Sequence, residues 1–570
     1  MITGLWVPDR RTLPPAPNVI LMTSPRTRPA LAVLVVAATA ATTTALLPAR
    51  AEPPIPPAVA STPLPLGPAG LAEQRTTEVL QPGVTLTTIV RGATSGEESW
   101  TVEMIVPSGA SDPDPDAPPS ALRDRVSAEE LAAALTAAGF AARVEEVVTP
   151  ALHDVPGGTI GFRVRVGSFA TLADANAELA RLQAAGYSGS SFFTGWDGDD
   201  PTDTGPWVVQ ALTVDPTLFD GELDASFGPD LERREATSAL AQAVGATAAV
   251  NAGYFVFSPL AGAPGDPAGV GVYNGKLLSE TIDGRPALHV RDDARHTAVL
   301  RLRWQGEMVA QDGTALRLDG IDRVPGLIRN CGGTGDQPTD LPRHDFTCTD
   351  SDELVAFTPE FGVATPSGDG AEAVLDPRGR VIEVRLPRGG EVPAGGNAVQ
   401  ATGALVDDLL AVATVGSKLR VESALVDEAG EEVDTSFRES IVNGGPELVR
   451  DGQLHVTAAA DGFVHPANPS FFYGFVHKRN PRTFAGVDPH GRAVLVTSDG
   501  RDTDTFGLSI AETAAVAQAL GLDDALNLDG GGSTTMVVDG QVINDPSDAT
   551  GERPVGDVLL ILPDRARGRH

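Results

Sequence analysis

The residues with the clearest potential for chemistry lie between Asn527 and Thr535, where a short apolar strand runs into three glycines and then three hydroxyl residues. Glycine lacks a Cβ and readily adopts positive φ, so the backbone of such a turn can approach a ligand closely. Its successive N–H groups form a nest that binds anions, and Ser533 and Thr534 add hydroxyl donors. These groups suit a phosphate diester or a polyhydroxylated sugar, whereas the plain alternative is a tight turn between strands.

Two arginines could complete an anion site, because Arg482 and Arg501 each stand in a polar turn beside predicted strands. A guanidinium group is planar, always charged and often binds phosphate oxygens through two parallel hydrogen bonds. In a chain with a net charge of −34, we predict that both arginines clamp a phosphate together with the glycine turn. Taken alone, either arginine could equally form a surface ion pair.

Carboxyl groups are needed if this site cleaves a glycosidic bond, since most glycosidases use one as an acid and another as a nucleophile or base. The sequence offers Asp529, Glu512, Asp499 and Asp502, and we predict catalytic roles among the first three. Glu512 opens a predicted helix at 513–520 and could simply cap it. A phosphodiester leaving group is already a weak base, so we hypothesise that one carboxylate and positive phosphate clamps suffice.

Metal chemistry is not expected, and the sequence predicts no cofactor. The acids Asp499, Asp502 and Asp504 offer the oxygen ligands that Ca²⁺ prefers, but solvated acids in a turn are the favoured explanation. His465 and His477 lack the spacing of a zinc site. The Gly-x-Ser-x-Gly elbow of serine hydrolases and the lysine of a Walker loop are also missing from the sequence.

Seven motifs in a fixed order carry a resemblance to a known family. They are Asn251-Ala252-Gly253-Tyr254-Phe255, Asn443-Gly444-Gly445-Pro446, Pro481-Arg482-Thr483, Asp499-Gly500-Arg501, Gly507-Leu508-Ser509 with Glu512, Asn527 to Ser533, and Glu552-Arg553-Pro554-Val555. Through these motifs the chain resembles the phosphodiester glycosidase family over about residues 205–562, with further strands at 79–107. The resemblance implies hydrolysis of a sugar-1-phosphodiester, which releases the sugar and a phosphomonoester.

The same resemblance implies which side chains contact the substrate. The expected substrate- and phosphate-binding residues are Asn251, Tyr254, Asn443, Arg482, Thr483, Arg501, Gly530, Gly531, Gly532, Ser533, Thr534 and Arg553. Among them, we expect Asn251 and Asn443 to hold sugar hydroxyls. The chain departs from the family at Asn480, where relatives often carry histidine, and this change removes a possible proton donor.

A second pattern, at residues 121–195, alternates helix and strand signals in a small self-contained unit. Ser127–Gly139 predicts a helix that begins at a capping box, and Thr171–Ala185 predicts a second helix. Ala142–Val148 and the strictly alternating Phe162–Phe169 predict two strands. Flanking strands would complete a ferredoxin-like βαββαβ insert.

This insert resembles the SPOR domain, a peptidoglycan-binding module. The residues that carry the resemblance are Arg163-Val164-Arg165-Val166-Gly167-Ser168-Phe169, Ala173, Ala175, Leu182 and Gly186-Tyr187. The resemblance implies that residues 121–195 dock on the glycan strands of the cell wall. A plain βα insert without a ligand is the alternative.

The amino-acid composition disfavours some kinds of ligand and indicates the fold class. The chain holds 42 basic and 76 acidic residues, which disfavours binding to nucleic acid or to an anionic membrane surface. Its 570 residues, 42% of them hydrophobic, are enough for two or three domains. The 62 glycines and 46 prolines indicate many turns and short strands. We therefore predict an α+β fold, with a large mixed β-rich domain at 205–562.

The first 51 residues are typical of a secretory signal. Positive charges precede the apolar run at 30–47, and a small-x-small cleavage site ends at Ala51. Met22 begins a more typical signal than Met1, and an uncleaved anchor is the alternative. We predict a secreted protein, extracellular or wall-associated, with no membrane contact after cleavage.

Other segments yield simpler expectations. Residues 52–78 and the acidic stretch 197–206 are predicted linkers, and 409–415 is a predicted strand. Cys331 and Cys348 are expected to form a disulfide in an oxidising compartment, and a metal site with His344 is the weaker alternative.

Together these patterns predict a secreted hydrolase that cleaves the glycosidic C–O bond of a sugar-1-phosphodiester in a wall or extracellular polysaccharide. A non-catalytic protein that binds wall glycan and a phosphodiesterase that cuts the P–O bond are the alternatives. The sequence leaves open the sugar, the stereochemical outcome, the acid and base assignments and the oligomeric state.

Overall fold

The computed structural model describes residues 62–107, 120–282, 284–329, 347–465 and 468–563. These ranges contain six α-helices and 34 β-strands, which confirms the predicted β-rich α+β class. The predicted signal peptide, residues 1–51, lies outside the described residues. Among the described helices, none has the length and apolar character that a membrane span requires.

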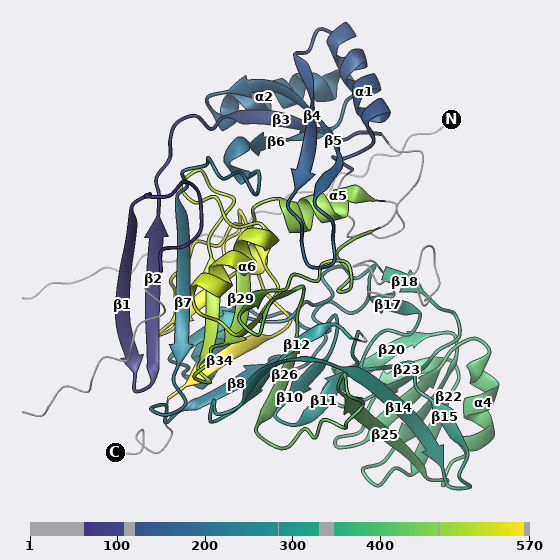
Figure 1. Ribbon diagram of the computed structural model, residues 1–570. Coiled ribbons are helices and arrows are strands. Elements are labelled where there is room, and N and C mark those ends of the chain that lie inside the picture. Colours follow the sequence, from purple (N-terminus) through teal and green to yellow (C-terminus); the bar gives the residue numbers. More distant parts are fainter. Residues whose placement is uncertain (1–61, 108–119, 283, 330–346, 466–467, 564–570) are drawn as a thin grey trace, which may run out of the picture. The chain divides into compact units, whose positions relative to one another are not determined.

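The largest sheet has eight strands and joins segments that are far apart in the sequence (Figure 1). In spatial order its strands are β1 (Glu73–Gln81), β2 (Val84–Arg91), β7 (Trp207–Val214), β30 (Ala493–Ser498), β29 (Arg482–Val487), β31 (Asp524–Asn527), β27 (Glu447–Arg450) and β28 (Gln453–Leu454). All neighbouring pairs are antiparallel. β1 begins inside the segment 52–78, so the predicted linker ends earlier than expected.

Both faces of the central strands are buried, because successive side chains of a strand point to opposite faces. On one face, Val209 and Phe484 belong to a large apolar core. On the other face, Leu212 and Leu495 belong to a second core. The eight-stranded sheet therefore runs through the interior of the large domain, which we define as the described residues outside 100–193.

Two five-stranded sheets flank this core. One consists of β33 (Gln541–Val542), β32 (Met536–Val538), β9 (Ala248–Asn251), β34 (Val558–Leu562) and β8 (Glu222–Ser226), and α3 (Thr237–Val244) packs on it. The other consists of β11 (Lys276–Ser279), β10 (Gly271–Tyr273), β26 (Glu439–Asn443), β12 (Pro286–Arg291) and β13 (Thr297–Arg301).

A peripheral part of the large domain lies between β13 and β26 in the sequence. Its three-stranded sheet is β15 (Ala315–Arg317), β14 (Arg303–Ala310) and β25 (Leu419–Val426), and its five-stranded sheet is β16 (Gly320–Ile321), β19 (Leu354–Phe357), β24 (Asn397–Ala401), β21 (Ala371–Leu375) and β22 (Val381–Arg385). Two strand pairs complete it, namely β17 (Leu327–Arg329) with β18 (Thr347–Thr349), and β20 (Ala364–Gly368) with β23 (Arg388–Glu391).

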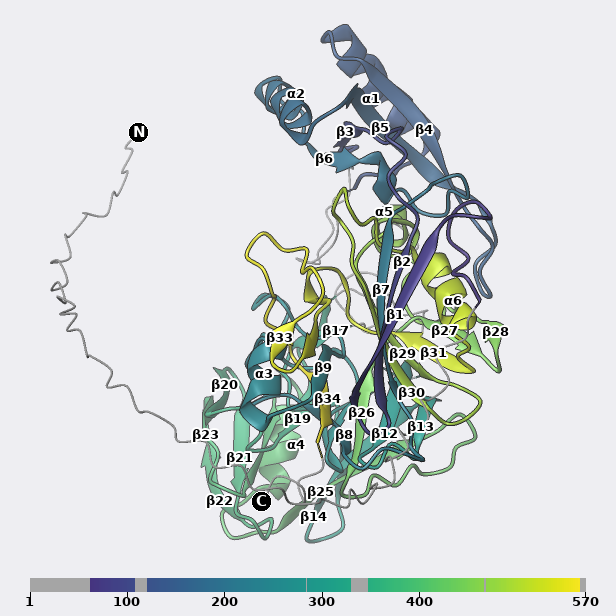
Figure 2. The ribbon, with the colours of Figure 1, turned by 90° about the vertical axis from the view of Figure 1, so that its left-hand side faces the viewer.

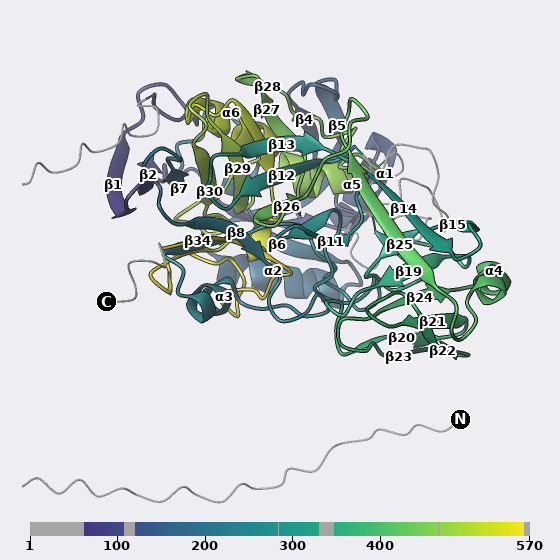
Figure 3. The same cartoon turned by 90° about the horizontal axis from the view of Figure 1, so that it is seen from below.

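Two predictions fall in this peripheral part. The predicted strand at 409–415 is wrong, because helix α4 (Leu405–Val412) occupies most of it and packs beside β21 and β24 (Figure 3). Leu405 and Leu409 are four residues apart and so face the same side of the helix, and Leu409 is fully buried. Cys348 is buried in β18, but Cys331 lies outside the described residues, so the disulfide stays a prediction.

The inserted unit, here called the module, has the order β3 (Trp100–Met104), α1 (Arg125–Ala137), β4 (Ala142–Thr149), β5 (Gly158–Phe169), α2 (Leu172–Ala184) and β6 (Gly189–Phe193). Its sheet has the strand order β4-β5-β3-β6 (Figure 2), which is the ferredoxin-like arrangement that the pattern predicted. The expectation that 79–107 belongs wholly to the large domain is wrong, because β3 pairs with β5 and β6. The cap of α1 is Asp124 rather than Ser127.

The acidic segment 197–206, predicted as a linker, makes dense contacts with both domains. Asp197 accepts hydrogen bonds from Arg163 and Arg165 of the module, and Asp203 forms an ion pair with Arg479 of the large domain. The composition of the segment suggested a linker, but two of its carboxylates, Asp197 and Asp203, have buried arginines as partners.

Three further helical elements of the large domain lie near its eight-stranded sheet. α5 (Pro469–Phe472) continues into a π-helical turn, η2 (Tyr473–His477), and α6 (Ile510–Ala519) packs against η2 and β27. α6 begins at a capping box in which Ser509 and Glu512 satisfy each other's backbone N–H groups.

Candidate active site

Three strands from three different sheets end in asparagine at one place. β9, β26 and β31 end at Asn251, Asn443 and Asn527. The Nδ2 atom of Asn251 donates to the carbonyl of Asp529, 2.6 Å away, and the amide of Asn443 pairs with the backbone of Tyr254 at 2.9 and 3.1 Å. These bonds join the motifs at 251–255, 443–446 and 527–533 into one structure.

The glycine turn after β31 forms one wall of the site. Gly531 has φ of 60°, and a Cβ at this position would lie 3.1 Å from Nη2 of Arg501. A Cβ at Gly532 would lie 2.2 Å from Nη2 of Arg553 and 2.2 Å from Oδ1 of Asp548. A larger residue at either position would have to displace the end of a neighbouring side chain, so glycine allows two guanidinium groups to lie against the backbone.

A cavity of about 310 Å³ opens on this turn and is called here the anion cavity. Its walls include the three glycines, the carboxylate of Asp529 and the side chains of Arg482, Arg501 and Arg553. The structure therefore brings the predicted arginines, the glycine turn and one predicted catalytic carboxylate to a single cavity.

Neutral oxygen atoms hold two of these arginines. Oδ1 of Asn480 accepts hydrogen bonds from Nε and Nη2 of Arg501 at 3.0 and 2.8 Å. Arg482 donates from Nε to the carbonyl of Leu508 at 2.9 Å and from Nη2 to the carbonyl of Phe475 at 2.5 Å. These bonds orient the guanidinium groups without neutralising them.

Arg482 is buried, whereas Arg501 is exposed. Burial lowers the pKa of Arg482 to about 10, and the charge of Arg501 adds to this effect. Desolvation followed by repulsion from Arg553 lowers the pKa of Arg501. Arg553 differs, because Asp548 pairs with it through two hydrogen bonds of 2.8 and 3.0 Å. An anion in the cavity would relieve the mutual repulsion of the arginines.

A second cavity of about 290 Å³, called here the aromatic cavity, adjoins the first. Tyr254, Phe255, Phe257 and Phe475 supply its aromatic walls. Phe475, Asp529 and Arg553 line both cavities. Asp529 consequently stands where a positively charged compartment meets an aromatic one.

Several predicted binding residues lie beneath the cavities rather than in their walls. Asn251 and Thr483 are fully buried and hydrogen-bonded to each other at 2.7 Å, and Asn443 is occupied by backbone groups. Their expected contacts with sugar hydroxyls are therefore not supported by the geometry. Tyr254 lines the aromatic cavity, but its hydroxyl donates to the carbonyl of Gly445.

The hydroxyls of Ser533 and Thr534 are also buried, and no hydrogen-bond partner for either occurs in the described part of the chain. Neither residue belongs to the walls of the two cavities. The structure thus places these predicted donors behind the glycine turn.

Two predicted catalytic carboxylates lie elsewhere. Glu512 caps α6 and accepts hydrogen bonds from Nε and Nη2 of Arg479. Asp499 is 5% exposed and accepts from Gln210 and from the N–H of Asp545 at 3.0 Å each, and burial raises its pKa. Of the three predicted catalytic residues, only Asp529 reaches the two cavities.

The described residues contain no group of three His, Cys, Asp or Glu side chains suited to a metal ion. Asp502 and Asp504 of the calcium alternative are exposed, and the carboxylate of Asp502 accepts the N–H of Asp504 within the turn.

Sequence reasoning missed two residues of the site. Phe475 stands between the cavities and stacks on Phe463, with ring centroids 4.6 Å apart. Asn480 was noted only as a departure from the family, yet it orients Arg501. The aromatic run at 471–475 was the available signal for the first, and the position of Asn480 directly before a motif was the signal for the second.

Comparisons with known proteins match two regions of the chain. Residues 369–562 match the phosphodiester glycosidase family, and residues 120–193 match the SPOR domain. A solved structure described as a "Putative exported protein" from Burkholderia pseudomallei is 35% identical, covers 89% of this chain and 99% of its own, and has a TM-score of 0.79. The chain belongs to the phosphodiester glycosidase family and carries a SPOR domain at 120–193.

Two further relatives bear the name of a characterised activity. Bovine N-acetylglucosamine-1-phosphodiester α-N-acetylglucosaminidase is 29% identical over 160 residues, which are 28% of this chain and 30% of that protein. The chain thus matches less than a third of the length of this curated relative. The zebrafish catalytic domain of the same name is 17% identical, covers 64% of this chain and 80% of its own, and has a TM-score of 0.32.

Proposed function

We propose that the protein hydrolyses a sugar-1-phosphodiester by cleaving the bond between the anomeric carbon and the phosphate oxygen. The observation that carries this proposal is the position of Asp529, which lines a cavity with three arginines and an adjoining cavity with four aromatic rings. A phosphodiester and a sugar ring would fill such a pair of compartments. Membership in the phosphodiester glycosidase family supports the same reaction class.

Each wall has a role in this reaction. Arg501 and Arg482 bind the phosphate, since pre-oriented donors stabilise charge where it develops. The predicted nest of N–H donors contributes little, because the N–H groups of Gly530 and Gly531 already donate to Asp529 and to the carbonyl of Pro481. The faces of Phe475 and Tyr254 hold the sugar ring. The anomeric C–O bond breaks, its electron pair stays on the phosphate oxygen, and the arginines balance the new charge.

Asp529 acts at the anomeric carbon, either as the nucleophile or as the base that takes a proton from the attacking water. Water supplies the hydroxyl group of the released sugar, and its remaining proton leaves with the solvent. The phosphomonoester departs as a weak base, so a second carboxylate is not needed to protonate it. This role agrees with the absence of Glu512 and Asp499 from the cavity walls.

The location and partners of the protein follow from its first segment and its module. The apolar run at 30–47 and a homologue described as exported support secretion, and the SPOR domain supports binding to peptidoglycan through residues 121–195. We therefore place the substrate among phosphodiester glycans of the wall or extracellular space. Fractionation of cells that produce the full chain tests this location.

Hydrolysis of a panel of wall phosphodiesters in ¹⁸O-water tests the reaction. We expect the label in the anomeric hydroxyl of the released sugar, and a loss of turnover of at least 1,000-fold in Asp529→Asn with unchanged thermal unfolding. Asp504→Asn, an exposed acid in the turn of Arg501, is the matched control and should retain turnover.

Three outcomes would overturn the proposal. Label in the phosphate would identify a phosphodiesterase that cuts the P–O bond. Binding without turnover of any member of the panel would identify a glycan-binding protein. Full turnover by Asp529→Asn would remove this residue from the chemistry.

A further inference from the structure

The module turns one face of its sheet toward the segment Tyr473–Arg482, which borders the anion cavity. Val164 and Val166 of β5 belong to the core beneath the module's helices. Because side chains alternate along a strand, Arg163 and Arg165 point to the opposite face. In Figure 1 the lower ends of β4 and β5 lie beside α5, which leads directly into this segment.

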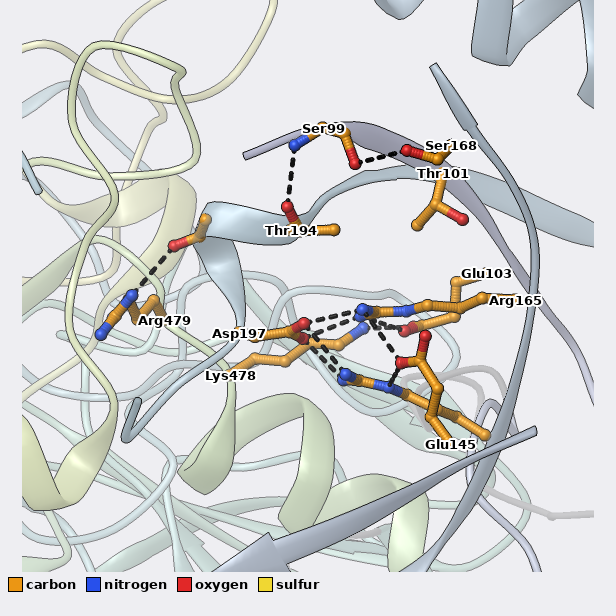
Figure 4. Close-up of polar contacts among 12 residues, drawn as sticks. Ser99, Thr101, Glu103, Glu145, Arg165, Ser168, Thr194, Asp197, Lys478 and Arg479 are labelled. Carbon is orange, nitrogen blue, oxygen red and sulfur yellow. Dashed lines mark hydrogen bonds and ion pairs between the residues drawn. The ribbon is translucent and has the colours of Figure 1, made fainter. Parts of the chain in front are cut away.

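This face carries a closed network of charges (Figure 4). Arg163 and Arg165 each donate to the carboxylate of Asp197, at 2.6 and 2.7 Å. Glu103 of β3 accepts from Nζ of Lys478 at 2.5 Å and from the hydroxyl of Tyr473 at 2.6 Å. The two domains are therefore joined by charged groups from both sides.

The centre of the network is excluded from water. Arg163, Arg165 and Lys478 face Glu103, Glu145 and Asp197, and Arg143 pairs with Glu145 at the exposed edge. Arg165 is 1% exposed and Glu103 is 3% exposed. Burial opposes ionisation of Glu103, but Lys478 and then Arg165 lower its pKa to about 2. Such a network persists only in one geometry, since a single lost partner leaves a buried charge uncompensated.

The backbone of the same segment holds the side chains of the anion cavity. The carbonyl of Lys478 accepts from Nδ2 of Asn480 at 3.0 Å and from Nη2 of Arg482 at 3.4 Å. The carbonyl of Gly474 also accepts from Nδ2 of Asn480 at 3.1 Å. Asn480 in turn orients Arg501. The segment Tyr473–Arg482 thus has side chains that bind the module and backbone carbonyls that orient the side chains of the anion cavity.

We propose that the docked module positions the phosphate-binding groups, and that Glu103 and Lys478 are positioning residues that act through Asn480 on Arg501. The module is then a working part of the active site as well as a wall-binding unit. This inference rests on the proposed function of the anion cavity. Neither Glu103 nor Lys478 lines that cavity, so any effect of these residues on an anion must pass through the segment.

Binding of inorganic phosphate to the full chain, measured by calorimetry, tests the proposal without requiring turnover. Lys478→Met removes the charge at similar length and should weaken phosphate binding about tenfold. Glu103→Gln should have a similar effect, and Lys478→Arg should restore most of the affinity. The double variant Glu103→Gln with Lys478→Met should lose less than the product of the single losses, because both act through one contact.

Two reference variants distinguish a failure of the positioning role from a failure of the anion cavity itself. Arg181→Met removes a charge that pairs with Glu178 on the exposed side of α2 and should leave phosphate affinity unchanged. Arg501→Lys removes the bidentate contact with Asn480 and should weaken phosphate binding most. If Arg501→Lys binds phosphate as the wild type does, the anion cavity itself is wrongly assigned and the proposed function fails.

A different result would contradict the positioning role. In that case Lys478→Met and Glu103→Gln would lower the thermal midpoint, but their phosphate affinity would stay within twofold of the wild type. Arg501→Lys would still lose phosphate affinity. That outcome would make the network a purely structural contact. Where a substrate has been found, the same variants should lower kcat/KM in step with phosphate affinity.

Discussion

The anion cavity and the module interface both concentrate arginine, but they hold it with different partners. At the interface, Arg163 and Arg165 share the carboxylate of Asp197. At the cavity, Arg482 and Arg501 are held by carbonyl and amide oxygens. Carboxylate partners neutralise a guanidinium group, whereas neutral oxygens fix its direction and leave its charge for a ligand.

The pKa values of the arginines also differ between the two regions. Burial works against the charged form of Arg165, yet the adjoining Asp197 raises its pKa well above the ordinary value. Burial lowers the pKa of Arg482 to about 10. Arg482 and Arg501 thus keep their charge for a ligand, whereas the charges of Arg163 and Arg165 are neutralised within the protein, and this difference is open to experiment.

The largest effect is expected from Arg479→Met, which tests an arginine that is paired with carboxylates. Arg479 is 1% exposed and pairs with Asp203 and Glu512. Its loss leaves two carboxylates without their cation, which should lower the free energy of unfolding by about 3–5 kcal/mol. Urea denaturation measures this, and a loss below about 1 kcal/mol would show that the buried pairs contribute as little as surface pairs do.

The next effect is expected from Gly532→Ala, which tests the close approach of Arg553 to the glycine turn. The new Cβ would clash with Arg553 and Asp548 and move the guanidinium group away from the turn. We expect kcat/KM to fall about 100-fold, as a displacement of about 1 Å can cause. Gly540→Ala, whose Cβ would meet no neighbouring atom although its φ of 74° strains alanine, is the control, with turnover compared per folded molecule. Equal kinetics for the two variants would contradict a role for the close approach.

A smaller effect is expected from Glu512→Gln, which separates capping from catalysis. Glutamine can still accept the N–H of Ser509 but no longer neutralises Arg479, so the free energy of unfolding should fall by about 1–3 kcal/mol. Turnover per folded molecule should stay within twofold of the wild type. A collapse of turnover comparable to that of Asp529→Asn would return Glu512 to the chemistry.

The smallest effect is a pH dependence of the module interface. Glu103 has a lower pKa in the folded protein, about 2 against an ordinary 4.5, so its stabilisation is complete above pH 4.5 and is lost as the pH falls toward 2. Lys478, Arg165, Arg163 and Tyr473 face this carboxylate. The stability difference between wild type and Glu103→Gln should shrink by less than about 1 kcal/mol from pH 5 to pH 4. A difference independent of pH over a wider range, down to pH 3, would contradict the shifted pKa.

The parts of the fold with local signals were predictable from the sequence. The alternation at 162–169 and the helical pattern at 171–185 predicted the order of the elements in the module. The glycine turn with Arg501 predicted one wall of the anion cavity. These features depend on side-chain period and on backbone freedom, which a sequence displays directly.

The remaining features depend on partners that are distant in the chain. The helix at Leu405–Val412 is selected by packing on β21 and β24, and a short apolar run alone does not distinguish it from a strand. Asparagine often binds ligands, yet the side chains of Asn251 and Asn443 form hydrogen bonds with backbone groups. Segment 197–206 has the composition of a linker, yet Arg163, Arg165 and Arg479 lie on either side of it.

The pairing of β2 with β7 has an evolutionary consequence. Arg91 lies opposite Trp207 in this antiparallel pair, so the chain leaves the large sheet and returns to it at neighbouring points. An ancestral hairpin at this place could have acquired the module in one genetic insertion without disturbing the sheet. Its later deletion would leave Lys478 without Glu103 and Asp197 without Arg163 and Arg165, so gaining the module was easier than losing it.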